Sequence, residues 1–272
     1  MINASGLLRH HRSLVWNADS GLLLWEISRK SPEGVTCGVC RSEQGKQILE
    51  QYGKTLEALD RPVLYARNTD KSDYISKEGF EKVLSFFETK SIIFDRLFFT
   101  DPFVTKESII SLAKGLFDAK SLSESWRAVI SQKIPSKAQR LSSLIKAQVF
   151  GHNVTVELKS SLEEMFEVEN KFFENKDSEL FSWDSEFISD SFKNAGFKVQ
   201  CVTKKFLEKK RITESDIKKW FDTENSLYGK TLMESLGKDK LQKIADVLLE
   251  ASSRMIFNWE SEICLLIVEP SS

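Results

Sequence analysis

Short apolar segments alternate with amphipathic segments along the N-terminal half of the chain. Apolar runs at 13–16, 35–40 and 61–66 are separated by stretches in which apolar residues recur every three or four positions. Apolar runs without polar alternation are typical of strands covered on both faces, and the amphipathic stretches between them are typical of helices. This alternation predicts an α/β protein with a doubly wound, mostly parallel sheet.

Four later segments complete the predicted sheet. The apolar run 91–99 predicts a central strand, and 128–131 predicts a fifth strand. Segments 197–203 and 262–268 supply a sixth and a seventh strand. We expect the seventh to insert beside the fifth or the sixth, which makes the sheet seven-stranded.

The second half of the chain is richer in helical patterns. The long interval between the sixth and seventh strands predicts a helical insertion over about 208–258. A stretch over 158–175, rich in Glu and Lys, is typical of a solvated helix face and not of a binding tail. Glycine and proline are scarce, so long flexible linkers are not expected, and we predict a single domain over 1–272.

Charge and hydropathy exclude two classes of protein. The chain carries 39 basic and 40 acidic side chains, and its formal net charge is −1. A strongly basic nucleic-acid clamp is therefore excluded, and charge does not indicate a nucleic-acid partner. No stretch approaches the roughly 18 uncharged apolar residues that a membrane span requires, so no membrane association is expected.

Cysteine and histidine residues suggest little metal chemistry. All four cysteines lie in apolar, strand-like runs, which predicts reduced buried thiols and a cytoplasmic protein. Cys37-Gly-Val-Cys40 has the spacing of some zinc and redox sites, but zinc needs four ligands and no second pair follows, so we predict core cysteines and no metal site. His10 and His11 precede the first strand in a basic stretch. They either touch an anionic partner or, as we expect, form an exposed and uncommitted pair.

The first strand and the turn after it carry a family resemblance. A strand leading into Asn17-Ala-Asp-Ser-Gly21, a second strand shortly after it and a final strand preceded by Trp259 resemble a class I S-adenosylmethionine-dependent methyltransferase. The likeness runs from Leu14 to Val268. It implies alternating strands and helices, an antiparallel seventh strand, and S-adenosylmethionine as the cofactor.

The cofactor motif of that family is degenerate in this chain. The family pattern, apolar-apolar-Asp-apolar-Gly-x-Gly-x-Gly, places Val15 at the acidic position, Asn17 and Asp19 at the first two glycines and Gly21 at the third. Asn and Asp tolerate the left-handed conformation, so the turn itself can persist. The resemblance assigns Asn17, Asp19 and Gly21 to the methionine part of the cofactor, although a carboxylate at position 19 would repel the methionine carboxylate.

Two further positions of the resemblance concern the ribose and the substrate. The acidic residue that accepts the ribose hydroxyls corresponds to Cys40, a poor acceptor, with Arg41 next to it. The segment Thr100-Asp101-Pro102-Phe103 resembles the [Asn/Asp/Ser]-Pro-Pro-[Tyr/Phe] loop of amino-group methyltransferases. That likeness implies substrate contacts from these four residues, and the alternative is an ordinary turn after a buried strand.

A second resemblance suggests a partner. Leu8-Arg-His-His-Arg-Ser-Leu-Val15 and the degenerate turn resemble the methyltransferase-like domain fused behind a replication-associated recombination ATPase of the AAA+ class. The chain lacks the Gly-x-x-x-x-Gly-Lys-[Ser/Thr] phosphate loop of the ATPase itself.

Two functions follow from these resemblances. One is a methyltransferase that acts on an unknown acceptor. The other is a catalytically silent module of the same fold that binds a protein partner and is linked to DNA replication or recombination. The eroded cofactor positions favour the second.

Overall fold

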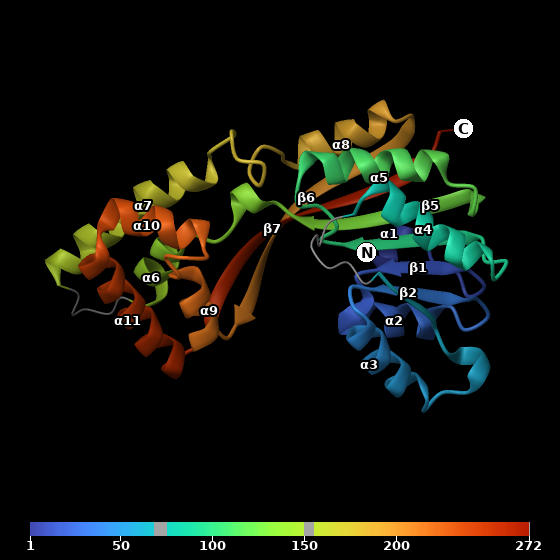
Figure 1. Ribbon diagram of the computed structural model, residues 1–272, viewed down its shortest axis with the longest axis horizontal. Coiled ribbons are helices and arrows are strands. Elements are labelled where there is room, and N and C mark those ends of the chain that lie inside the picture. The colour runs from blue at the N-terminus through green and yellow to red at the C-terminus, as the bar shows by residue number, and fades with distance from the viewer. Residues whose placement is uncertain (68–74, 150–154, 272) are drawn as a thin grey trace. The chain divides into compact units, whose positions relative to one another are not determined.

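The structure is a computed structural model of the chain, and it describes residues 1–67, 75–149 and 155–271. The described residues form two compact units. The first unit comprises the described residues within 1–133, 183–204 and 263–271, and the second comprises those within 134–182 and 205–262. Figure 1 labels most of their helices and strands. The prediction of one domain with an insertion at about 208–258 stays a prediction.

A seven-stranded sheet runs through the described residues in the order β3-β2-β1-β4-β5-β7-β6. Neighbours from β3 to β5 pair in parallel, and β7 pairs antiparallel with β5. The predicted sheet, the central position of β4 and the insertion of the last strand beside the fifth and sixth are confirmed. The strands are β1 (Ser13–Trp16), β2 (Thr36–Cys40), β3 (Val63–Ala66), β4 (Phe94–Thr100), β5 (Leu122–Lys133), β6 (Phe197–Lys210) and β7 (Phe257–Pro270).

Helices cover both faces of the sheet in the first unit. Side chains of α2 and α3 pack with β1 and β2 in one core cluster, which also contacts the N-terminal segment. Aromatic rings of α4 meet Trp16 and Phe94 on the other face, and α5 packs between α4 and α8. The helices are α1 (Ile2–Ser5), α2 (Leu22–Lys30), α3 (Glu43–Gly53), α4 (Lys77–Glu88), α5 (Lys106–Asp118) and α8 (Ser185–Asn194), with short 3₁₀ turns η1 (Ala18–Ser20) and η2 (Ala58–Asp60).

Local sequence signals account for these elements. Every residue of β1 and β2 is buried, as their unbroken apolar runs predict. Thr105 caps α5 in a capping box with Ser108, and Gly196 takes a left-handed conformation with φ of 92° after α8.

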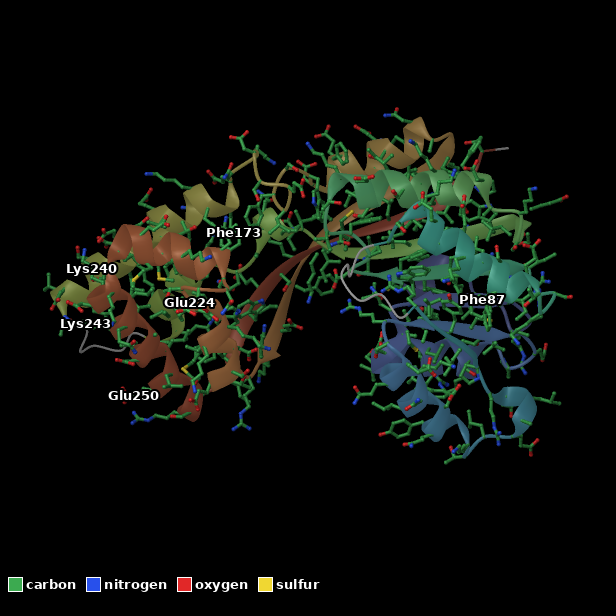
Figure 2. The ribbon with its side chains drawn as sticks, in the orientation of Figure 1. Phe87, Phe173, Glu224, Lys240, Lys243 and Glu250 are labelled. Carbon is green, nitrogen blue, oxygen red and sulfur yellow. The ribbon has the colours of Figure 1, made fainter. Side chains whose placement is uncertain are left out.

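The second unit is mainly helical. Its core joins apolar side chains of α6, α7, α10 and α11. Lys240 and Lys243 of α11 donate to Glu164 and Glu157 of α7, at 2.5 and 2.7 Å, and Figure 2 labels both lysines. The helices are α6 (Leu141–Gln148), α7 (Val156–Phe173), α9 (Glu214–Trp220), α10 (Leu227–Leu236) and α11 (Lys238–Arg254), preceded by the 3₁₀ turn η3 (Pro135–Lys137).

The last two strands are longer than predicted. β6 continues to Lys210 and β7 begins at Phe257. Both ends of the expected helical insertion are therefore β-strand and not helix. Residues 200–209 of β6 are all exposed. A strand without a buried face shows no apolar alternation, so its sequence resembles that of a polar helix or loop.

Three expectations about polar side chains are wrong. His11 is 7% exposed, and its Nδ1 accepts a hydrogen bond from the Leu8 amide at 3.0 Å, so it is neither exposed nor uncommitted. Glu169, in the stretch assigned to a solvated helix face, is fully buried. Cys201 is exposed, unlike Cys37, Cys40 and Cys264, whose predicted burial is confirmed. Each exception depends on tertiary contacts that spacing along the chain does not encode.

The described residues include neither a membrane-spanning helix nor a cluster of metal ligands. None of the described helices is both long and apolar enough to cross a membrane. Within the same residues, no three His, Cys, Asp or Glu side chains gather as a metal-binding group.

Candidate functional site

The turn after β1 lies at the carboxyl ends of the parallel strands. Ligands of open α/β sheets bind at this edge. Asn17 and Gly21 both take left-handed conformations, with φ of 60° and 72°, and the short helix η1 lies between them. The expectation that the turn persists without its first two glycines is confirmed, because Asn adopts this conformation at little cost.

The Asn17 side chain links three strand ends. Its Nδ2 donates to the Thr100 carbonyl at the end of β4, at 2.9 Å, and its Oδ1 accepts from Arg67 Nη2, just after β3, at 3.0 Å. The Arg67 guanidinium also lies over the Trp16 ring, 4.8 Å from its centroid. The Thr100 hydroxyl is 3.9 Å from the Met1 sulfur. Asn17 therefore bridges protein groups at the place where the resemblance predicts cofactor contacts.

Asp19 joins the same turn to the start of α3. Its two carboxylate oxygens accept hydrogen bonds from the Arg41 backbone amide, at 3.0 and 3.1 Å. The carboxylate also lies against Gly45, because a Cβ built at Gly45 would be 2.4 Å from Asp19 Oδ1. A carboxylate near the N-terminus of a helix is favoured by the helix dipole. The negative charge expected to repel a cofactor thus has partners within the protein.

Cys40 does not reach this edge. Its side chain is fully buried in the core cluster with Val15 and Leu24. Burial raises the pKa of the Cys40 thiol to about 12, and the nearby Asp19 charge adds to the shift. A buried neutral thiol is not placed to accept hydrogen bonds from ribose hydroxyls. The nearby carboxylate of Glu43 pairs with Lys46 at 3.1 Å.

The loop after β4 is held by β5. The Asp101 backbone amide donates to the Ser131 carbonyl at 2.8 Å. The Asp101 Oδ1 accepts from the Lys133 amide at 2.7 Å. Asp101 has a positive φ of 45°. Gln132, which is 3% exposed, accepts from the Phe103 amide at 2.9 Å and donates to its carbonyl at 3.3 Å.

Phe103 is itself 3% exposed, and its ring lies near Phe192 of α8. The loop is therefore an anchored turn whose aromatic ring packs inward. The substrate contacts assigned to Thr100, Asp101, Pro102 and Phe103 stay predictions.

The predicted site residues are thus only partly brought together. Asn17 meets Thr100, and Asp19 meets Arg41, whereas Cys40 and Phe103 point into the interior. Sequence reasoning missed Arg67 and Gln132. Gln132 had a visible signal, since it is a polar residue next to an apolar strand. Arg67 had none, because its partner Asn17 is 50 residues away.

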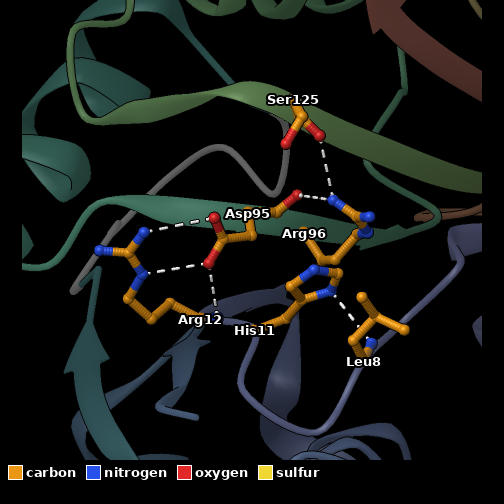
Figure 3. A network of polar contacts seen from close by, with 6 residues as sticks. All are labelled: Leu8, His11, Arg12, Asp95, Arg96 and Ser125. Atoms are coloured by element: carbon orange, nitrogen blue, oxygen red, sulfur yellow. Dashed lines mark hydrogen bonds and ion pairs between the residues drawn. The ribbon is translucent and has the colours of Figure 1, made fainter.

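A second polar network lies near the amino ends of β1 and β4. Asp95 accepts hydrogen bonds from the Arg12 amide at 2.9 Å and from its guanidinium at 3.0 and 3.3 Å, as Figure 3 shows. Arg96 donates to the carbonyls of Asp95 and Ser125 at 2.6 and 3.1 Å. Arg9 in turn pairs with Glu33. The basic stretch before β1 therefore binds groups of the protein itself.

A cavity of about 630 Å³ also lies at the amino ends of the strands of the first unit. Its lining includes Val35 and Thr36 at the start of β2 and Arg61 just before β3. Trp25 and Tyr52 provide aromatic walls. The cavity is at the amino ends of the strands and is separate from the turn after β1.

Comparisons with known proteins return solved structures only. No family model matches the chain, and no curated protein matches it. The YcgJ protein from Bacillus subtilis is 10% identical, with a TM-score of 0.48 over 100% of this chain and 97% of that chain. A cyclopropane-fatty-acyl-phospholipid synthase-like protein from Lactobacillus casei is 12% identical, with a TM-score of 0.49 over 96% and 85%. Precorrin-6y C5,15-methyltransferase from Geobacter metallireducens is 9% identical, with a TM-score of 0.44 over 99% and 84%.

The strand order defines the class of fold. A parallel sheet in the order β3-β2-β1-β4-β5, closed by an antiparallel β7 between β5 and β6, is the arrangement expected from the methyltransferase resemblance. The chain therefore has a Rossmann-like methyltransferase fold. Fold alone does not define an activity, which depends on the site.

The described residues do not fit the contacts that S-adenosylmethionine would need under the resemblance. The residue at the ribose position, Cys40, is a buried thiol. The Arg41 backbone amide already bonds to Asp19, and the Asn17 side-chain amide already bonds to Thr100 and Arg67. The polar groups that the resemblance assigns to the cofactor therefore already have partners within the protein.

Proposed function

We propose that this chain is a catalytically silent protein of the methyltransferase fold that serves as a protein-interaction module. One observation carries the proposal: both Asp19 carboxylate oxygens accept from the Arg41 amide, which ties the turn after β1 to the start of α3. A carboxylate held at this position opposes a second carboxylate, such as that of methionine. The competing function is a methyltransferase with an unknown acceptor, which the left-handed turn at Asn17 and Gly21 supports.

A calorimetric titration with S-adenosylhomocysteine tests the silent part of the proposal. We expect no heat at millimolar ligand. Binding tighter than about 100 μM, roughly −5.5 kcal/mol, would overturn the proposal and favour the enzyme. The titration needs only the purified chain and does not depend on the methyl acceptor.

A double variant shows whether Asp19 and Cys40 account for the lost affinity. Asp19→Gly removes the charge repulsion, and Cys40→Asp restores acceptors for two ribose hydroxyls. We expect this folded double variant to bind S-adenosylhomocysteine measurably more tightly than the wild type. An unchanged titration would mean that other residues close the site, with the Asn17 bridge to Thr100 and Arg67 as the next to be removed.

The binding surface that we propose lies on the outer strand β6 in the second unit. Residues 205–209 are exposed, and the Phe206 and Leu207 side chains are 48% and 65% exposed. β6 is the last strand in the sheet order, so its outer edge offers unpaired backbone groups. Three lysines and Arg211 within 205–211, against the single acid Glu208, favour an acidic extended segment.

The resemblance drawn from the sequence supplies the partner to test first. It is the replication-associated recombination ATPase of the AAA+ class, in the cytoplasm. We expect purified ATPase to bind the full chain and Leu207→Asp to weaken that binding at least tenfold, because an aspartate there repels an acidic segment. Leu227→Asp, at a comparably exposed position of α10, is the matched control. Equal affinity for both variants would exclude this strand edge as the binding surface.

A further inference from the structure

Two cysteines that are distant in the sequence meet on neighbouring strands of the first unit. Cys201 of β6 and Cys264 of β7 have their sulfur atoms 3.3 Å apart. Cys201 is exposed, whereas Cys264 is 1% exposed. The contact follows from the sheet order, because β7 lies between β5 and β6 and Cys264 is in register with Gln132 of β5. One thiol is thus open to solvent and the other lies directly behind it.

The surroundings of Cys201 favour its thiolate. The hydrogen bond with Cys264 lowers the pKa of Cys201 to about 7, burial opposes the shift, and Lys193 of α8 assists it. The pKa of Cys264 is raised, chiefly by the same hydrogen bond and by burial. Because the thiolate is the nucleophile in disulfide exchange, Cys201 is suited to react first and Cys264 second.

We propose that Cys201 and Cys264 form a reversible disulfide by exchange with a small disulfide such as glutathione disulfide. The Cys201 thiolate attacks one sulfur of glutathione disulfide, forms a mixed disulfide and releases one glutathione thiolate, which takes up a proton. The Cys264 thiol then loses its proton and attacks the Cys201 sulfur, which releases the second glutathione. The protein loses two electrons and two protons, and one glutathione disulfide becomes two glutathione molecules.

The other cysteine pair provides an internal control. Cys37 and Cys40 have the Cys-x-x-Cys spacing that sequence reasoning considers first. They are three positions apart on one strand, so their side chains point to opposite faces of the sheet, and both are fully buried. Burial raises the pKa of both thiols. Neither is placed to form a disulfide with the other.

The experiment equilibrates the full chain with glutathione disulfide and then denatures it in the presence of N-ethylmaleimide, which blocks every remaining thiol. After digestion, mass spectrometry should find the peptides of Cys201 and Cys264 linked, with Cys37 and Cys40 carrying N-ethylmaleimide. Linkage should also raise Tm by several degrees, since it closes a long loop. Reduction with dithiothreitol should reverse both changes.

Variants separate the two steps. Cys264→Ser should stop the reaction at the glutathione mixed disulfide on Cys201. Cys201→Ser, a change at an exposed position, should abolish both the mixed disulfide and the Tm rise, and Cys37→Ser should change neither. A wild-type chain that keeps glutathione on Cys201, or that leaves both cysteines as thiols, would overturn the proposal.

Discussion

Asp19 in the first unit and Glu169 in the second perform the same task in different surroundings. Asp19 is half-buried and accepts from one backbone amide, that of Arg41. Glu169 is fully buried and accepts from two amides, those of Leu141 and Ser142, at 2.7 and 3.1 Å. The comparison teaches that an acidic side chain near a predicted site can be a structural cap, and that burial sets how much the fold depends on it.

Glu169 completes a helix that lacks a cap of its own. The residue before α6, Arg140, makes no side-chain cap bond, and Glu169 of α7 supplies the acceptor instead. The Ser142 hydroxyl and the Tyr228 hydroxyl also donate to this carboxylate, the latter at 2.6 Å. Arg140 lies over the Phe173 ring, 4.2 Å from its centroid. The carboxylate therefore connects α6, α7 and α10 inside the second unit.

The largest expected effect comes from Glu169→Ala. It leaves two amides and two hydroxyls without their acceptor in a buried place, and we expect the free energy of unfolding to fall by about 3 kcal/mol. Urea unfolding followed by circular dichroism measures this loss. Glu167→Ala, at an exposed position of the same helix, should change it by less than about 0.5 kcal/mol. Equal losses of unfolding free energy in both variants would show that the burial of Glu169 does not set how much the fold depends on it.

The pH dependence of Glu169→Gln gives a smaller effect with a defined sign. Burial raises the pKa of Glu169 above 4.5, and hydrogen bonds from Ser142, Tyr228 and the Leu141 amide offset this only in part. A raised pKa in the folded state means that the carboxyl's stabilising contribution is complete below 4.5 and is lost as the pH rises through the raised value. Wild-type stability should therefore fall relative to Glu169→Gln across that window. A gap that is constant from acidic to neutral pH would show that Glu169 does not titrate as its burial implies.

Asp95 is an intermediate case between the two carboxylates. Its side chain is 13% exposed and pairs with Arg12, so Asp95→Ala should cost about 1 to 2 kcal/mol. Burial raises the pKa of Asp95, but the Arg12 hydrogen bonds outweigh this and the net pKa is lowered. The contribution should be present above 3.8 and lost as the pH falls through the lower folded-state pKa. The free energies of unfolding of the wild type and of Asp95→Ala should converge as the pH falls through that pKa. Glu33→Ala, which removes an exposed ion pair, should leave the acid unfolding of the wild type unchanged.

The smallest stability effect is expected for Asp19→Ala. The bond to the Arg41 amide is partly open to water, so its loss should cost about 0.5 to 1 kcal/mol. Thermal unfolding compares this variant with Glu57→Ala, an exposed control in the same unit. A loss as large as that of Glu169→Ala would mean that Asp19 stabilises the sheet through more than its hydrogen bonds with the Arg41 amide.

The sequence predicts the parts of the fold that depend on local pattern. The runs 13–16 and 35–40 are buried strands because only apolar side chains fit a sheet covered on both faces. The sequence also predicts the turn after β1, because Asn17 and Gly21 themselves tolerate the left-handed conformation. Elements with strong local signals therefore matched the structure closely.

What the sequence did not predict depends on contacts between distant segments. Glu169 looks like any charge on a polar helix until the amides of α6 are placed beside it. Arg67 and Asn17 meet only because β1 and β3 end at the same edge. Asn17 and Asp19 lie at the edge of the sheet where the sequence predicts a site, but bonds to distant residues decide what their side chains contact.

The contact between Asp19 and Gly45 couples the substitutions that these two positions tolerate. A side chain added at position 45 would push the carboxylate of Asp19 away from the Arg41 amide. A larger residue at position 45 should therefore cost stability in the wild type and much less in Asp19→Gly, so the effects of substitutions at 19 and 45 should not add.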